Sequence, residues 1–333
     1  MTAADLEKRH DPQVAIRDFQ PEDYPAIVEI ANAAYPDHPT TVEERRFEDE
    51  NFDRTKYVWR RYVGADPSTG RVISEAEYNH LPWSYDPLRF GIWVAVHPGS
   101  RRRGIGGLLY ERVLEDLRTY DATQIRSSCQ ETMTPALAFL KQRGFRELRR
   151  SWESRLDVRA FDFAPFAKYW EPPPGTEIVT LQEELAKGSD CVRQVYDMDS
   201  ELSLDEPRYD PFTPIDFGMW RQWVLESPRA LPEAFFLAKD GDRYVGQSNF
   251  ERNETLADVL YTGFTCVRRE YRGRGIAMAL KLRAIEYAKS RGCREIRTWN
   301  STLNAPMLGI NVKLGFVKQP AWIALGKDGG AAG

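Results

Sequence analysis

Hydrophobic and polar residues follow a pattern that occurs twice along the chain. Each half opens with a short strand pattern, at 15–17 and at 177–179, followed by a helical segment, at 24–35 and at 191–198. Three further strands are predicted in each half, at 56–63, 72–77 and 90–96 and again at 234–239, 244–251 and 259–267. The pattern predicts an α/β (α+β) fold of two tandem domains, each with a mixed, mostly antiparallel sheet flanked by helices.

A helix is predicted directly after the third of these strands in both halves. In the first half its apolar residues are spaced three and four positions apart, at Ile105, Leu108, Leu109, Val113, Leu114 and Leu117. In the second half they recur every four positions, at Ile276, Leu280, Ala284 and Ala288. A stripe of this kind is typical of a helix that packs one face against a sheet.

The two halves align without a gap over the region that carries this helix. Val96, Gly104 and Gly144 correspond to Val267, Gly275 and Gly315, and each pair is 171 positions apart. Two copies with so long a period do not fit a solenoid. We therefore interpret the chain as a fused pair of related domains.

Prolines mark the border between the two copies. Pro165, the prolines at 172–174 and Gly175 interrupt any regular element. We predict an N-terminal domain at 1–163, a stiff proline-rich linker at 164–176, a C-terminal domain at 177–326 and a flexible tail at 327–333.

Composition excludes several classes of protein. The 333 residues include 46 basic and 50 acidic ones, a net charge of -4, which argues against a nucleic-acid-binding protein. The four cysteines form no CxxC pair and the four histidines have no ligand spacing, so neither a metal site nor a disulfide framework is expected. The polar start of the chain and the lack of a long apolar run predict a cytoplasmic protein without a membrane anchor.

A turn rich in glycine and arginine lies between the third strand and the following helix of each copy. It reads Arg-Arg-Arg-Gly-Ile-Gly at 101–106 and Arg-Gly-Arg-Gly-Ile-Ala at 272–277. Unpaired N–H groups at a helix start attract anions, glycine lets the anion approach the backbone, and guanidinium groups suit phosphate oxygens. The turn therefore predicts a pyrophosphate cradle in each copy.

Two other phosphate-binding motifs fit the turn less well. The first copy lacks the last glycine of the GxGxxG dinucleotide fingerprint, and neither copy has the Gly-Lys-Ser/Thr of a Walker A loop. The structural alternative is a helix start with glycines for packing and arginines for solvation. The occurrence of the turn twice in one register favours ligand binding over that alternative.

Each half has a strand, an Arg-x-x-Gly-x-Gly/Ala turn, a helix, a second strand and a later helix that ends in Gly-Phe. This order of elements resembles the GCN5-related N-acetyltransferase (GNAT) superfamily in both halves. The resemblance implies acetyl-CoA or a related acyl-CoA as the donor substrate, without a metal or a nicotinamide. It implies that the third strand runs apart from its neighbour and pairs with the pantetheine arm through Val94, Ala95, Val96, Thr265, Cys266 and Val267. It implies that the pyrophosphate is bound by Arg101, Arg102, Arg103, Gly104, Ile105, Gly106, Gly107, Arg272, Gly273, Arg274, Gly275, Ile276 and Ala277.

The last helix of the second copy carries Asn304 and Asn311, which the resemblance implies as cofactor contacts; helix capping is the alternative role. Many family members place a tyrosine four residues before the glycine of Gly-Phe, where it can protonate the departing thiolate. Leu140 and Asn311 stand there in this chain, so the usual general acid is missing.

A catalytic base is expected on the strand before the glycine-turn strand. We predict Glu251 for the second copy, while Glu75 or Glu77 holds the similar place in the first; an ordinary exposed carboxylate is the alternative role for each. Because the second copy keeps polar residues where the first has apolar ones, we predict that it is the principal catalytic domain, with Glu251 and Asn311 as catalytic residues.

Acidic segments at 43–53 and 197–210 are expected over the acceptor clefts. They would attract a cationic amine, although a solvated face is the alternative. We predict a small-molecule amine as the acceptor, no nucleic-acid or membrane partner, and either a monomer that forms a two-domain pseudo-dimer or a homodimer. Two other functions stay open: a non-catalytic acyl-CoA-binding sensor or scaffold, and a protein or peptide N-acetyltransferase.

Overall fold

The computed structural model describes residues 14–188 and 190–329 and divides the chain into two compact units. Among the described residues, unit 1 comprises 14–81, 85–127 and 326–329, and unit 2 comprises 82–84, 128–188 and 190–325. Residues 128–163, which precede the predicted linker, therefore pack within unit 2. The predicted polar start at 1–11 and the last residues of the predicted tail, 330–333, lie outside the described residues.

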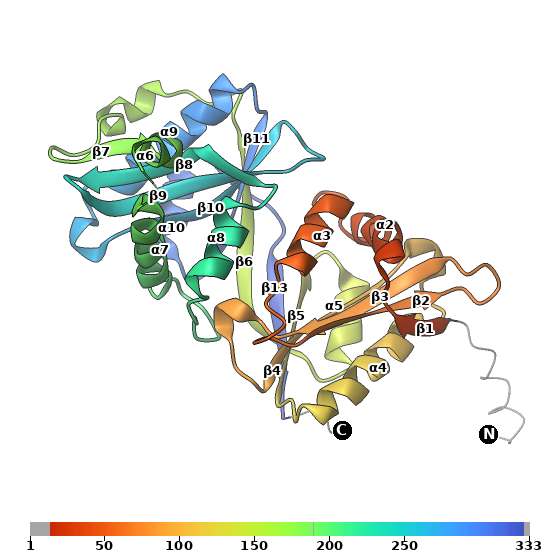
Figure 1. Cartoon of the computed structure of the whole chain (residues 1–333). Helices are drawn as coiled ribbons and strands as arrows, with labels where there is room; N and C mark the ends of the chain where they lie inside the picture. Colours follow the sequence, from red (N-terminus) through yellow and green to blue (C-terminus); the bar gives the residue numbers. More distant parts are fainter. Residues whose placement is uncertain (1–13, 189, 330–333) are drawn as a thin grey trace, which may run out of the picture. The chain divides into compact units, whose positions relative to one another are not determined.

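Unit 1 is built on a sheet with the strand order β1-β2-β3-β4-β5. These strands are β1 (Ala15–Asp18), β2 (Trp59–Ala65), β3 (Val72–Asn79), β4 (Arg89–Val96) and β5 (Gln124–Gln130). The first four pair antiparallel, whereas β4 and β5 pair parallel. The helices α2 (Tyr24–Ala34) and α3 (Val42–Glu50) cover one face of this sheet, and α4 (Ile105–Thr119) covers the other (Figure 1).

The two faces of the unit 1 sheet differ in what holds them to their helices. On the α2 face, Ile27 and Ile30 pack with Val63 of β2 in an apolar cluster. On the α4 face, Tyr62 and Tyr78 both donate a hydrogen bond to Asp116 of α4. The predicted apolar stripe of α4 is buried except for Leu108, which is 49% exposed; its place in the stripe was predicted wrongly.

Unit 2 contains a larger sheet with the order β13-β6-β11-β10-β9-β8-β7, and β12 pairs with β6. Its strands are β6 (Arg146–Asp157), β7 (Glu177–Thr180), β8 (Ala230–Asp240), β9 (Arg243–Arg252), β10 (Val259–Val267), β11 (Glu295–Ser301), β12 (Val317–Lys318) and β13 (Trp322–Asp328). The pairs β6–β11, β6–β12, β9–β10, β8–β9 and β7–β8 are antiparallel, whereas β10 runs parallel to β11. Both sheets are therefore mixed and mostly antiparallel, as the sequence pattern predicts.

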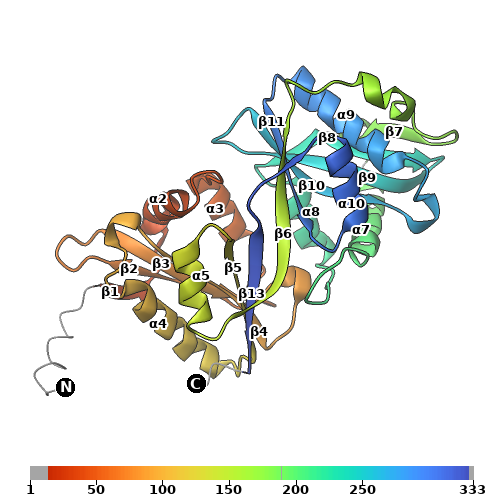
Figure 2. The same cartoon turned by 180° about the vertical axis from the view of Figure 1, so that it is seen from behind.

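The helices of unit 2 are α5 (Thr134–Lys141), α6 (Leu181–Lys187), α7 (Asp190–Ser203), α8 (Phe217–Leu225), α9 (Ile276–Ser290) and α10 (Ala305–Lys313). Figure 2 shows α9 lying along one face of the sheet, and α7 and α8 cover the opposite face. Side chains alternate between the two faces along β9: Gln247 bonds Asp199 of α7, while its neighbour Ser248 faces α9.

The segment predicted as a stiff linker packs against the core of unit 2. It contains a 3-10 helix (Ala164–Tyr169), and Phe163, Phe166 and Trp170 lie against the apolar cluster under α9. The amino group of Lys289 donates to the carbonyl oxygen of Phe161 at 2.6 Å, which fixes the start of the segment to α9.

All four cysteines are free and buried: Cys129 and Cys266 lie on strands, Cys191 lies in α7, and Cys293 lies shortly after the end of α9. Burial raises the pKa of each thiol, that of Cys129 to about 11. Their side chains therefore act as small apolar groups in the cores of the two units.

Leu280 tests the role of α9 in stabilising unit 2. Its side chain is fully buried among the residues of the core cluster. We expect Leu280→Ala to lower the free energy of unfolding by about 2–5 kcal/mol, measured by urea denaturation, because it leaves a cavity in a packed core. The control is Leu303→Ala, at a residue 68% exposed, which should change it by less than about 0.5 kcal/mol. Equal effects of the two substitutions would contradict this account of the core.

Candidate functional site

Both glycine turns have the same backbone conformation. Gly104 and Gly275 precede α4 and α9 in the left-handed region, with φ of 81° and 94°. Two positions earlier, Arg102 and Gly273 are also left-handed, with φ of 66° and 76°. A glycine before the helix has no side chain that could cap the first turn, so the N–H groups there face an incoming anion.

An arginine fastens each turn to the end of the strand before it. The Nε atom of Arg101 donates to the carbonyl oxygen of Val96 at 3.0 Å, and that of Arg272 donates to Val267 at 2.9 Å. These matched bonds hold the two turns at the same distance from their strands. The predicted pyrophosphate residues are therefore brought together in both units.

The two turns differ in charge. Arg101, Arg102 and Arg103 are exposed in unit 1. In unit 2, Asp205 accepts hydrogen bonds from Arg269 at 3.0 Å and from Arg272 at 2.5 Å. These bonds lower the pKa of Asp205 to about 2, so its negative charge offsets the arginines beside the second turn.

The strand before each turn separates from its parallel neighbour. In unit 1, β4 pairs with β5 at residues 89–91, and in unit 2, β10 pairs with β11 at residues 259–261. The predicted pantetheine-pairing residues, 94–96 and 265–267, all lie beyond these paired segments. Each unit therefore has an opening between two strands that leads to its glycine turn.

A β-bulge distinguishes the second opening from the first. The register of β10 against β9 shifts between Thr262 and Thr265, whereas β4 pairs with β3 without a shift. The side-chain oxygen of Asn249 accepts a hydrogen bond from the backbone N–H of Phe264 in the bulge, at 2.8 Å. Gly263 makes this approach feasible, because a Cβ there would lie 2.3 Å from the Asn249 side chain.

The bulge also changes which residues of the two units correspond. Glu75 lies opposite Ala95 on β4, and Gln247 lies opposite Cys266 at the matching position of β10. By the same register, Asn249 takes the place of Glu77 next to the bulge. Unit 2 thus has amides where unit 1 has carboxylates.

Glu75 is the centre of a buried charged cluster in unit 1. Its side chain is fully buried; Oε1 accepts from the indole of Trp93 at 3.1 Å, and Oε2 has no hydrogen-bond partner among the described residues. Burial raises the pKa of Glu75 to about 7. The carboxyl group is therefore able to exchange a proton near neutral pH.

Two arginines balance the neighbouring carboxylates. Arg61 donates to Glu77 at 2.9 Å and to Asp49 at 2.8 Å, and Arg45 lies 3.5 Å from Glu77. Burial opposes ionisation of Glu77, but the charges of Arg45 and Arg61 outweigh it and lower its pKa. Glu77 is thus held as an anion, while Glu75 is held as an acid that ionises late.

Unit 2 has a buried carboxyl group on the corresponding face. Asp199 of α7 accepts from the side-chain amide of Gln247 at 2.8 Å, and burial raises its pKa to about 6. Sequence reasoning placed Asp199 only in a general acidic segment. The sequence feature that could have identified Asp199 is its position on the helix, because it shares the buried stripe with Val195 and Leu202.

The residues predicted for the second copy are separated in the structure. Asn304 caps α10 by accepting from the N–H of Met307 at 3.3 Å, and Asn311 is buried and donates to Asn300 at 2.6 Å. Glu251 lies at the paired end of β9, opposite Tyr261, with its side chain 40% exposed and 3.3 Å from Arg229. The catalytic roles of Glu251 and Asn311 stay predictions.

Within residues 14–188 and 190–329, no helix is both long and apolar enough to cross a bilayer. Within the same ranges, no three His, Cys, Asp or Glu side chains form a group that could hold a metal ion.

Comparison with known proteins finds similarity in both halves of the chain. The model of the acetyltransferase (GNAT) family matches residues 24–145 and again residues 194–316. The mycothiol acetyltransferase of Thermobifida fusca is 27% identical over 266 residues, which cover 75% of this chain and 77% of that protein. A mycothiol acetyltransferase of Actinosynnema mirum is 26% identical over 68% of this chain and 71% of its own length.

Solved structures share the fold. A tandem GNAT protein from the clavulanic acid biosynthesis pathway has a TM-score of 0.74 at 20% identity, covering 96% of this chain and 99% of that one. A GCN5-related N-acetyltransferase from Sphaerobacter thermophilus has a TM-score of 0.69 at 21% identity, covering 95% and 96% of the two chains.

A substitution of Asp205 tests the predicted pyrophosphate cradle in unit 2. We expect Asp205→Asn to bind coenzyme A roughly threefold more tightly, measured by calorimetry at low salt, because the half-exposed Arg272 loses its ion-pair partner. The gain should shrink as ionic strength rises. The control is Asp197→Asn, which breaks an exposed ion pair with Arg193 on α7. An equal effect of both substitutions would show that only the net charge matters.

Proposed function

The chain belongs to the GNAT acetyltransferase family, and from that premise we propose that it is an N-acyltransferase. In this proposal an acetyl or related acyl group passes from an acyl-CoA to the amine of a small molecule, by direct attack in a ternary complex. The observation that carries the proposal is the pairing, in both units, of a left-handed glycine turn with a strand that separates from its neighbour.

The donor site follows from these two features. The turn offers backbone N–H groups and arginine side chains to the pyrophosphate. The freed edge of β4 or β10 offers backbone donors and acceptors to an extended pantetheine arm, as a missing strand would. The thioester is thereby held at the inner end of the strand opening.

Glu75 is the base that we favour. It lies on the strand next to β4, opposite Ala95, in the segment expected to pair with the pantetheine arm. With Oε2 unoccupied by any described residue, it can accept the proton that the attacking amine loses. The equivalent residue of unit 2 is the amide Gln247, which cannot take up a proton. We therefore propose that unit 1 carries out the principal transfer, whereas the sequence pattern alone favours the second copy.

The reaction then proceeds without a dedicated acid. The neutral amine attacks the thioester carbonyl carbon, a strand N–H stabilises the oxygen as it becomes negative, and the C–S bond breaks as the amide forms. Glu75 takes the proton from the amine nitrogen. A thiol with a pKa near about 8.5 departs as a thiolate, so a residue such as Leu140 is tolerated at the position where family members place tyrosine.

The acceptor is proposed to be a small cationic amine. Asp49 and Glu77 are balanced by Arg61 and Arg45, so the attraction is assigned to the exposed carboxylates of Glu43 and Glu50 on α3. The names of the curated relatives, which are mycothiol acetyltransferases, also support a small acceptor.

A second role is proposed for unit 2 because amides stand at its base positions. With Gln247 and Asn249 in place of Glu75 and Glu77, unit 2 is suited to binding an acyl-CoA without rapid transfer. It would then act as a sensing or scaffolding module within the same chain.

A matched pair of variants tests which unit carries out the transfer. We expect Gly104→Trp to lower kcat/KM by about 100-fold or more, because a bulky side chain in the left-handed turn keeps the pyrophosphate away. Gly275→Trp should leave most of the turnover intact. The assay follows thiol release from acetyl-CoA with a panel of amines, and circular dichroism checks that both variants fold. The opposite result would assign the transfer to unit 2.

Glu75→Gln tests the base through the pH profile. For the wild type, kcat/KM should rise with pH through about 7, since Glu75 is active only once it is ionised. The variant should lose this rise of kcat/KM with pH, and its kcat should fall by about 100-fold or more. The control is Glu48→Gln, at a carboxylate that is 55% exposed on α3, which should leave the profile unchanged. A variant that keeps the limb near pH 7 would exclude Glu75 as the base.

A further inference from the structure

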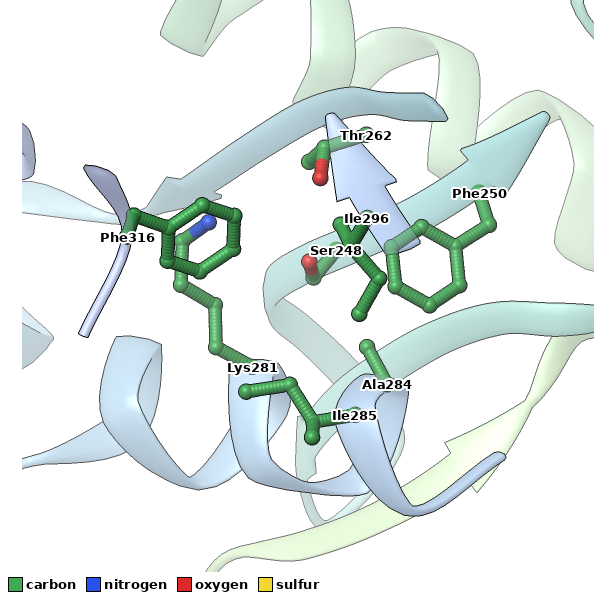
Figure 3. Close-up of a pocket in the computed structure, with 8 residues that line it drawn as sticks. All are labelled: Ser248, Phe250, Thr262, Lys281, Ala284, Ile285, Ile296 and Phe316. Carbon is green, nitrogen blue, oxygen red and sulfur yellow. The ribbon is translucent and has the colours of Figure 1, made fainter. Parts of the chain in front are cut away.

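A small pocket lies between α9 and the sheet of unit 2. Its walls are formed by β9, β10, β11, α9 and Phe316, and its polar lining consists of Ser248, Thr262 and Lys281 (Figure 3). The Lys281 side chain extends from α9 into the pocket, and the hydroxyl groups of Ser248 and Thr262 point into the same space. The pocket is thus an apolar recess with three convergent polar groups.

Lys281 has an unusual environment for a lysine. It is 4% exposed, and no hydrogen-bond or ion-pair partner for its amino group exists among the described residues; its contact is with the ring of Phe316, 5.5 Å away. No carboxylate lines the pocket. Burial alone lowers the pKa of Lys281 to about 8, so the group still carries a charge at neutral pH. A buried cation without an anion is costly unless a ligand supplies the anion.

The pocket lies at the closed end of the opening between β10 and β11. Ile296 belongs to the segment that pairs with β10, and Thr262 is the first residue of β10 beyond that pairing. From Thr262 to Val267, next to the turn, an extended strand spans roughly 16 Å. A thioester whose pyrophosphate binds at the turn and whose arm follows β10 therefore brings its acyl group toward Lys281.

Unit 1 lacks these polar groups at the matching positions. Tyr110 stands 171 positions before Lys281 on α4. Ala76 lies opposite Val94, where unit 2 has Ser248 opposite Thr265 with their hydroxyls 2.9 Å apart. The two units thus share the strand opening and differ at its inner end.

We propose that unit 2 selects an acyl-CoA whose acyl group ends in a carboxylate, of the malonyl or succinyl class, and that Lys281 binds that carboxylate. This inference rests on the proposed binding of acyl-CoA by unit 2 and names its acyl group. The lysine provides the charge, and the hydroxyl groups of Ser248 and Thr262 can donate further hydrogen bonds to the carboxylate oxygens. A neutral chain of the same length would offer no anion to the amino group of Lys281.

The test compares succinyl-CoA with butyryl-CoA, which has the same chain length without the carboxylate. Calorimetry is carried out on the full chain carrying Gly104→Trp, so that unit 2 is the site measured. We expect succinyl-CoA to bind about tenfold more tightly than butyryl-CoA. Adding Lys281→Met should remove this preference by weakening succinyl-CoA, with butyryl-CoA changed by no more than about twofold. If that variant fails to fold, Ser248→Ala should reduce the preference several-fold.

The matched control is the chain carrying Gly275→Trp, which reports unit 1 and should bind both thioesters equally. Equal affinities in unit 2, or a preference that survives Lys281→Met, would overturn the inference while leaving the proposed acyl-CoA site intact. If unit 2 binds neither thioester nor coenzyme A itself, the proposed function of unit 2 fails together with the inference.

Discussion

Both units are organised around two parallel strands that pair over three residues and then separate. Backbone groups beyond the separation need other partners, since unpaired buried N–H and C=O groups are costly. The structure supplies some of them: Arg101 and Arg272 bond the last carbonyls of their strands, and the hydroxyl of Ser127 donates to the carbonyl of Ile92 at 3.2 Å. What is left along β4 and β10 forms an edge that, in the proposed donor site, an extended ligand completes while the glycine turn at its end binds a phosphate.

The two copies keep this frame and differ in the side chains around it. Unit 1 places carboxylates at Glu75 and Glu77, whereas unit 2 places the amides Gln247 and Asn249 there. On the other face of the sheet, Lys281 of unit 2 replaces a tyrosine. Two duplicated sites that share a backbone arrangement but differ in the surrounding side chains can bind related ligands for different purposes.

The turns and their helices could be predicted because their signals are local. Left-handed glycines and a stripe with a period near 3.6 need no knowledge of the rest of the chain. The place of Glu251 could not be predicted, because it depends on the register between β9 and β10: Glu251 lies opposite Tyr261, in the segment of β10 that pairs with β11, away from the glycine turn. Lys281 was missed for another reason: it is a charged residue on the buried side of α9, and only the packing shows that no anion accompanies it.

The burial of the cysteines has a consequence for the proposed transfer, in which coenzyme A leaves as a thiol. Exchange with a disulfide needs an accessible thiolate, and each of the four thiols has both a raised pKa and a covered sulfur. The folded chain is therefore protected against forming mixed disulfides with oxidised coenzyme A, even where Cys266 lies on the strand proposed to hold the pantetheine arm. A product thiol can leave the protein without becoming tethered to it.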